Sequence, residues 1–164
     1  MADLRIITTG GTFDKLYDAI KGDLTFRESQ LPRILINSRL GIECRLEGPL
    51  AKDSLYMSDE DRKNILRYVE ASVEKRIVVI HGTDTMCETA KVVAAGDIKD
   101  KTVVFTGAMI PYSLENSDAE FNLGFAVSSA LLLKSGVYIA MNGRIFDYDN
   151  VRKNREKGIF EEIM

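Results

Sequence analysis

Two hydroxyl-bearing stretches follow apolar segments directly, and they are the clearest candidates for chemistry in this chain. Thr9-Gly10-Gly11-Thr12 comes after an apolar run that begins at Leu4, and His81-Gly82-Thr83-Asp84 comes after Ile77–Ile80. A threonine hydroxyl becomes a nucleophile only when a neighbouring group takes its proton. Turns that follow parallel strands gather at the carboxyl edge of an open α/β sheet. We therefore predict a single site built from both stretches.

Each stretch also has a purely structural interpretation, and the spacing alone leaves both open. Thr12 could be a nucleophile assisted by Tyr17, or it could only cap a turn while Tyr17 packs on the surface. Thr83 and Asp84 could activate an alcohol or hold an amino group. Alternatively, Thr85 could cap the following helix, with Asp84 favouring the helix dipole. The glycine turn lacks the spacing of known phosphate-binding loops.

Four further positions could contribute to such a site. Lys153 could act as the base if the tail folds back over the sheet edge, although a tail lysine is usually solvated. Asp53-Ser54 could hold a substrate carboxylate or form an Asx turn. His81 is better explained as a core histidine than as a catalytic base. The turn after residue 106, which contains Ala108, could bring backbone close to a ligand.

Composition excludes several classes of partner. The net charge of −3 comes from 22 basic and 25 acidic residues, so electrostatics do not favour nucleic acid or an anionic membrane. We see no signal segment, and no apolar run approaches the roughly 20 residues of a membrane span. Cys44 and Cys87 are expected to be reduced thiols of a cytoplasmic protein. A single histidine, His81, argues against a zinc site, so no metal or cofactor is expected.

The elements that must position these residues alternate along the chain. Apolar runs predict strands at residues 4–8, 77–80, 102–105 and 137–141, and an alternation of apolar and polar residues predicts one at 41–46. Helical spacing predicts helices at 29–40, 58–74, 85–95 and 117–134, with capping boxes at Ser58 and Ser117. Residues 12–27 have no steady period and are expected to form a functional loop. The charged tail, 144–164, shows no clear core face.

This alternation predicts an α/β fold in which helices flank both faces of a parallel sheet, as in flavodoxin-like domains. We expect one domain over residues 1–164, with residues 143–164 packing at the sheet edge. The turns after the first four strands carry Thr12, Ser54, the Thr83-Asp84 pair and Thr106. All four turns would then lie along one edge of the sheet.

The two threonine stretches resemble the two threonine motifs of the bacterial-type L-asparaginase family. His81-Gly82-Thr83-Asp84-Thr85-Met86 matches the second motif almost letter for letter. The segments 107–109, 121–123 and 137–142 resemble those that follow in the family. The resemblance covers almost the whole chain, but only the amino-terminal domain of long family members. It implies an amidohydrolase with the fold of that domain.

Catalytic roles follow from the resemblance for four residues. Thr12 resembles the primary nucleophile, and Tyr17 is the best match for the loop tyrosine that assists it. Thr83 matches the second threonine of the family. Lys153 matches the lysine that pairs with that threonine.

Substrate-binding roles follow in the same way. Ser54, in the pair Asp53-Ser54, matches the serine that holds the α-carboxylate of the substrate. Asp84 matches the aspartate that binds the α-amino group. Ala108 matches a position that contacts the side-chain amide through its backbone.

The activity implied is hydrolysis of L-asparagine to L-aspartate and ammonia through a threonine acyl-enzyme, without a cofactor. A glutaminase, another small-amide hydrolase and a non-catalytic amino-acid-binding module remain as alternatives. In long family members a second domain of a neighbouring subunit supplies a glutamate to the site. We expect this chain to resemble single-domain forms, in which a homodimer closes the site with Glu156, Glu161 or Glu162.

Overall fold

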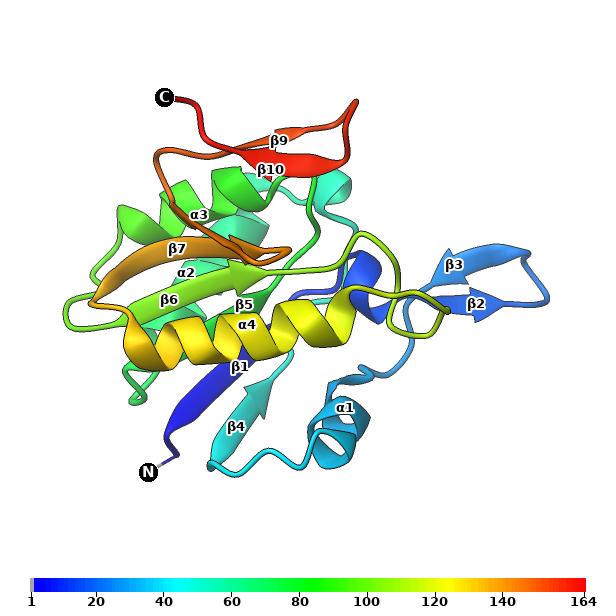
Figure 1. The fold of residues 1–164 in the computed structure, drawn as a ribbon, viewed down its shortest axis with the longest axis horizontal. Helices are drawn as coiled ribbons and strands as arrows, with labels where there is room; N and C mark the ends of the chain where they lie inside the picture. Colours follow the sequence, from blue (N-terminus) through cyan, green and yellow to red (C-terminus); the bar gives the residue numbers. More distant parts are fainter. Residues whose placement is uncertain (1) are drawn as a thin grey trace.

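The computed structural model describes residues 2–164 (Figure 1). The strands are β1 (Leu4–Thr8), β2 (Leu16–Asp18), β3 (Asp23–Thr25), β4 (Cys44–Glu47), β5 (Arg76–Ile80), β6 (Thr102–Thr106), β7 (Gly136–Met141), β8 (Arg144–Asp147), β9 (Arg152–Asn154) and β10 (Ile159–Glu161). The α-helices are α1 (Leu31–Asn37), α2 (Asp59–Ala71), α3 (Met86–Ala94) and α4 (Ala119–Leu132). Short 3₁₀ turns cover Thr12–Asp14 and Ser54–Tyr56.

The central sheet has the strand order β4-β1-β5-β6-β7-β8. All neighbours from β4 to β7 pair in parallel, and only β8 runs antiparallel to its neighbour. Counted along the chain, the parallel strands lie in the order 2-1-3-4-5, which is the flavodoxin-like arrangement. The predicted fold class is therefore confirmed. The order reverses between β1 and β5, so the crevice that such sheets use for ligands lies where these two strands end.

Two hydrophobic cores cover the two faces of this sheet. Alternate residues of one strand belong to different cores: Val78 packs with residues of α1 and α4, whereas Val79 packs with residues of α2 and α3. Figure 1 shows α4 crossing one face of the sheet. Burial on both faces explains why β5 reads as a continuous apolar run.

One of the two predicted capping boxes forms. At the start of α2, the Ser58 hydroxyl accepts from the Asp61 N–H, and the Asp61 carboxylate accepts from the Ser58 N–H. The box predicted at Ser117 is wrong, because α4 has Asp118 at its N-cap without a side-chain capping bond. The Asp118 carboxylate instead accepts from the backbone N–H groups of Met109 and Ile110.

Residues 12–27 are more regular than a loop. After the first 3₁₀ turn, β2 and β3 form an antiparallel hairpin that projects away from the sheet (Figure 1). The Asp18 carboxylate accepts from the N–H groups of Ile20 and Lys21, and Gly22 adopts a φ of 71°. An Asx turn followed by glycine is a common way to reverse a chain, and this local chemistry replaces the expected irregular loop.

The expectation that the tail lacks a core face is also wrong. Strand β8 joins the sheet beside β7, and β9 pairs with β10 in a separate hairpin. Phe146, Val151 and Phe160 are all buried in the core that also contains α2 and α3. These apolar residues are spaced irregularly among charged ones, so no single period identifies them.

Candidate active site

The turn after β1 is held between its two neighbouring segments. On one side, the Thr9 N–H and hydroxyl both donate to the Ile80 carbonyl, at 3.0 and 2.7 Å. On the other side, the Lys52 N–H donates to the Thr9 carbonyl, and the Gly11 N–H donates to the Lys52 carbonyl. These bonds extend the parallel pairing beyond the strands. They fix the first threonine stretch beside both neighbouring turns.

Glycines allow the three turns to touch. Gly11 has a φ of 76°, and a Cβ atom there would lie 2.5 Å from the Cα and N atoms of Gly82. A Cβ atom on Gly82 would lie 2.6 Å from the Ser54 Oγ. Both distances are far shorter than a real contact, so only glycine fits. Thr12 and Thr83 each follow one of these two glycines, so the turns that carry the two threonines lie against each other.

A lysine from the tail reaches this group. Lys153 on β9 lies with its Nζ 2.7 Å from the Thr83 Oγ1 and 2.9 Å from the Asp84 Oδ1. Thr83 is buried, and the Lys153 side chain is only 12% exposed. As an ammonium ion this amine donates to both partners, and as a neutral amine it can accept the hydroxyl proton of Thr83. The tail therefore folds back over the sheet edge.

A second cation lies next to the same carboxylate. The Arg155 Nε is 3.5 Å from the Asp84 Oδ1, and the arginine side chain is largely exposed. Sequence reasoning did not single out Arg155, and its place among several basic tail residues carries no signal that would identify it.

Ser54 is buried and packs directly against Gly82. Its carbonyl accepts from the Thr85 hydroxyl at 2.9 Å, and its Oγ accepts from the Thr85 N–H at 3.3 Å. Thr85 occupies the N-cap position of α3 without a side-chain capping bond. Its hydroxyl therefore joins two turns and does not cap the helix.

The neighbouring Asp53 is held by an ion pair that the sequence did not predict. Its Oδ2 lies 2.8 Å from the Lys15 Nζ, and its Oδ1 accepts from the Leu55 N–H. The hydrogen bond from Lys15 and the positive charge of Lys153 contribute to holding the pKa of the Asp53 carboxyl below its usual value. Asp53 is thus an anion at neutral pH. Its pair with Lys15 ties the first 3₁₀ turn to the segment that carries Ser54.

A buried polar network supports the turn that contains Ala108. The Asn122 amide donates to the Gly107 carbonyl at 2.9 Å and to the Asp118 carboxylate, and its oxygen accepts from the Asn142 N–H. Ala108 itself is buried in the core beneath this turn. Sequence reasoning missed this network because it considered Asp118 only as part of the capping box predicted at Ser117.

Tyr17 and Thr12 are not joined by a hydrogen bond within residues 2–164. Tyr17 lies on β2, in the hairpin that Figure 1 shows projecting from the sheet. The residue is 60% exposed. Thr12 is half-buried at the start of the 3₁₀ turn. The structure thus links the turns of Ser54 and Gly82 and the side chains of Thr83, Asp84 and Lys153, with Thr12 in the adjoining turn that contacts Gly82 through Gly11. Tyr17 lies apart from them on the hairpin.

His81 is a core histidine, as predicted. It is fully buried, its Nδ1 donates to the Gly82 carbonyl at 2.7 Å, and its Nε2 accepts from the Thr89 hydroxyl at 2.7 Å. A carbonyl can only accept, which fixes the neutral tautomer with its proton on Nδ1. Burial lowers the pKa of His81 to about 4, despite the opposing effect of the Gly82 carbonyl.

This burial predicts a pH-dependent stability. The folded pKa lies below the unfolded value of 6.5, so the contribution of neutral His81 is complete above pH 6.5 and is lost as the pH falls towards 4. The expected loss is about 3 kcal/mol in the free energy of unfolding. Urea titrations at pH 7, 5 and 4 should show it. Because His81 is the only histidine in the chain, H81Q should flatten the profile in this window, and an unchanged profile would contradict the assignment.

Two absences can be stated for residues 2–164. No helix in this part of the chain is long and apolar enough to cross a membrane. No group of three or more histidine, cysteine, aspartate or glutamate side chains is placed there to hold a metal ion.

The site thus consists of two threonine turns and a lysine at the switch point of a doubly wound α/β domain. Residues 3–159 match the family model described as "Asparaginase, N-terminal". The chain belongs to the asparaginase family, and its fold is that of the amino-terminal domain.

Relatives and solved structures agree with this assignment. The chain is 29% identical to a glutaminase-asparaginase of Acinetobacter glutaminasificans over 90% of its own length and 48% of that protein. It is 42% identical to L-asparaginase 2 of Escherichia coli over 79 residues, which cover 46% of this chain and 23% of the relative. The thermostable L-asparaginase from Thermococcus kodakarensis superposes with a TM-score of 0.85 at 28% identity, covering 98% of this chain and 51% of that structure. The chain thus spans about half the length of the L-asparaginase structure and of the glutaminase-asparaginase.

Proposed function

We propose that this chain hydrolyses the side-chain amide of L-asparagine to L-aspartate and ammonia through a threonine acyl-enzyme. The observation that carries the proposal is the contact of the Lys153 amine with the Thr83 hydroxyl and the Asp84 carboxylate, at 2.7 and 2.9 Å. A base in contact with a buried threonine is what activation of a hydroxyl requires. Membership of the asparaginase family supports the same reaction class.

The reaction would proceed in two steps. The Thr12 oxygen attacks the amide carbon, its proton is transferred to the amide nitrogen, and ammonia leaves as an ester forms. Water then attacks the ester carbon, and the pair of Thr83 and Lys153 takes the proton of that water. The bond to the Thr12 oxygen breaks, that oxygen regains a proton, and aspartate leaves. Backbone N–H groups near Gly11 and Thr83 would stabilise the oxyanion, typically by about 3 kcal/mol per donor. Tyr17 would assist Thr12 only after its hairpin closes over the site.

Substrate binding would use the rim of the same crevice. Ser54 would hold the α-carboxylate, and the anionic Asp53 beside it would position that serine through the 3₁₀ turn. Asp84 would bind the α-amino group. The backbone at Ala108 would meet the side-chain amide. We further propose a homodimer as the working unit and the cytoplasm as its location.

A second candidate function is hydrolysis of glutamine, which the similarity to a glutaminase-asparaginase favours. The test is ammonia release from L-asparagine and from L-glutamine under identical conditions, together with a Ser54→Ala variant. We expect faster release from asparagine and a KM at least about tenfold higher for the variant, since one hydrogen bond to a charged group is worth roughly 1.5–3 kcal/mol. Faster release from glutamine would favour the second candidate. Binding of either amino acid without ammonia release would leave only a binding module.

A further inference from the structure

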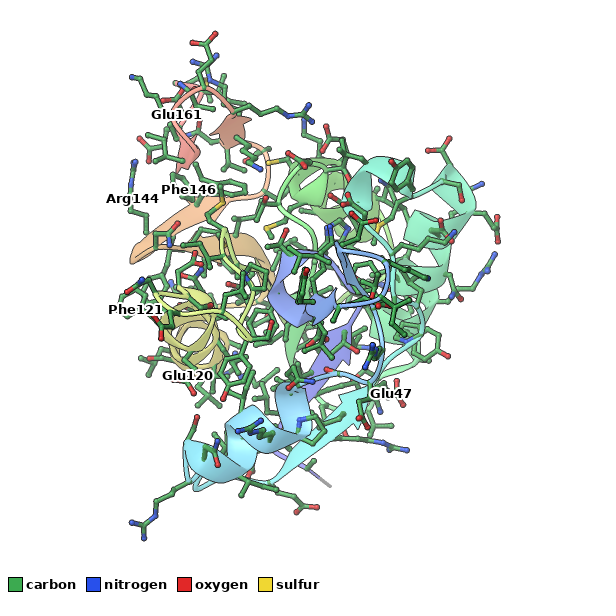
Figure 2. All side chains as sticks on the ribbon, turned by 90° about the vertical axis from the view of Figure 1, so that its right-hand side faces the viewer. Glu47, Glu120, Phe121, Arg144, Phe146 and Glu161 are labelled. Carbon is green, nitrogen blue, oxygen red and sulfur yellow. The ribbon has the colours of Figure 1, made fainter. Side chains whose placement is uncertain are left out.

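Lys15 lies at the boundary between the packed part of the domain and the β2–β3 hairpin. It follows the 3₁₀ turn that begins at Thr12, and it immediately precedes β2, which carries Tyr17. Lys15 is only partly exposed, whereas residues 19–24 at the far end of the hairpin are all exposed. Figure 1 shows the hairpin projecting from the sheet, and Figure 2 views the molecule from that side, with the hairpin towards the viewer. A contact that fixes Lys15 therefore fixes the base of the hairpin.

Three neighbouring segments hold Lys15. Its Nζ lies 2.8 Å from the Asp53 Oδ2, and the two side chains are 18% and 29% exposed. The same Nζ lies 5.7 Å from the ring centroid of Phe26, which directly follows β3. The Lys15 carbonyl accepts from the Ser113 hydroxyl at 2.8 Å. The lysine thus links both ends of the hairpin to the segment that carries Ser54.

The Asp53 carboxylate completes this link through its two oxygens. Its Oδ1 accepts from the Leu55 N–H, inside the 3₁₀ turn that carries Ser54, while its Oδ2 accepts from the Lys15 ammonium group. Both side chains are largely buried, and opposite charges attract more strongly there than in open solvent. A new charge at the turn of Ser54 therefore acts directly on Lys15.

Ser54 has a hydrogen-bond donor that the chain does not use. Its Oγ accepts from the Thr85 N–H at 3.3 Å, but no acceptor for its own proton lies within residues 2–164. Ser54 is buried, and buried polar groups usually find a partner. A ligand carboxylate would supply the acceptor. Its negative charge would then lie beside the Asp53 carboxylate, where Lys15 is the cation already in contact.

We propose that Lys15 is a positioning residue that couples the binding of a carboxylate at Ser54 to the position of the Tyr17 hairpin. This inference rests on the proposed function, which places the α-carboxylate of the substrate at Ser54. In the free protein, Asp53 neutralises Lys15. A bound carboxylate competes with Asp53 for the same ammonium group, so the lysine shifts towards the ligand and the base of the hairpin moves with it. A ligand without an α-carboxylate binds without moving the hairpin.

A single introduced tryptophan can report the position of the hairpin, because the chain has none of its own. Leu24→Trp places it on β3 directly opposite Tyr17, at a position that is already 39% exposed. L-Aspartate, the product of the proposed reaction, is the first ligand. β-Alanine is the matched one, since it lacks only the α-carboxylate. Saturating L-aspartate is expected to shift the emission of L24W, whereas β-alanine is not; equal shifts with both ligands, or none with L-aspartate, would overturn the proposal.

Calorimetric titration with L-aspartate separates this coupling from a merely structural ion pair. Lys15→Met is expected to weaken binding about tenfold, since a hydrogen bond between charged groups is lost. Asp53→Asn removes the competing anion but keeps an oxygen that can accept from the Leu55 N–H, so it is expected to bind at least as tightly as the wild type. A merely structural pair predicts weaker binding in both variants. Equal weakening in K15M and D53N would therefore overturn the proposal.

Lys52→Met is the matched control variant. Lys52 adjoins Asp53 in the chain, and its Nζ forms an ion pair of the same length, 2.8 Å, with Asp61 on α2. K52M thus removes an equivalent ion pair that does not involve the hairpin. It is expected to bind L-aspartate like the wild type, and all three variants should keep the wild-type circular dichroism spectrum. Weakening in K52M as large as in K15M would overturn the proposal.

Ammonia release from L-asparagine distinguishes this inference from the proposed function. If the chain releases no ammonia but K15M and D53N bind L-aspartate as expected, the proposed function fails and the coupling stands. If the chain hydrolyses asparagine but K15M binds L-aspartate like the wild type, the coupling fails and the proposed function stands.

Discussion

Replacing Lys153 with methionine is expected to lower kcat for asparagine hydrolysis by about 10²–10⁴, the usual contribution of a positioned proton-transfer group. Methionine keeps most of the length of the side chain but removes the amine that contacts Thr83 and Asp84. Thr83→Ala should cause a loss of similar size because it removes the partner of that amine. The double variant should be no worse than either single one, since the two groups act as a unit.

Lys157→Met is the matched control for this experiment. Lys157 is an exposed lysine in the turn of the same hairpin, so its substitution should leave kcat unchanged. Thr12→Ala removes the proposed nucleophile and should also reduce ammonia release by at least about 10³. Undiminished turnover in K153M and T83A would contradict the mechanism, and an additive loss in the double variant would show that the pair does not act together.

Introducing one methyl group at Gly11 is expected to disrupt both the fold and the site. The Cβ atom of Gly11→Ala would lie 2.5 Å from backbone atoms of Gly82. Neither backbone can move without breaking the bonds that extend the sheet. Together with the strain of a φ of 76°, this overlap should cost about 4 kcal/mol in the free energy of unfolding. Thermal unfolding should show a fall in Tm of about 10 °C or more.

Gly22→Ala separates the two causes of this effect. Gly22 has almost the same φ, 71°, but a Cβ atom there would meet nothing within 4 Å. Its substitution should cost only the backbone strain, about 1 kcal/mol, or roughly 3 °C in Tm. Equal falls in Tm for the two variants would mean that the contact between Gly11 and Gly82 does not matter.

The central sheet could be predicted because its strands are buried on both faces. Strands such as β5 read as continuous apolar runs, and helices with clear periods separate them from β5 onward. The hairpin of β2 and β3 could not be predicted in this way, because its strands are short and Tyr17 and Leu24 remain exposed. In the tail, Phe146, Val151 and Phe160 are buried one at a time among charged residues, so burial there follows no period.

Part of the candidate site could be predicted from topology alone. Turns after parallel strands must share one edge, and this places Thr12, Ser54 and Thr83 together. The contact between Lys153 and Thr83 needed the resemblance to the family, because 70 residues separate the two side chains. Lys15 and Arg155 were not predicted as partners of Asp53 and Asp84. Ion pairs between a loop or tail and a distant turn leave no local signal.

The contact of Gly11 with Gly82 has a consequence for how such sites diverge. Here the base of the crevice is made of main-chain atoms, which point mutations cannot reshape without loss of the fold. Evolution towards a longer or shorter amide is therefore confined to the surrounding segments, namely the β2–β3 hairpin, the turn at Ser54 and the strand that carries Lys153. Exchanging these segments among homologues, with the glycines untouched, offers a direct route to new selectivity.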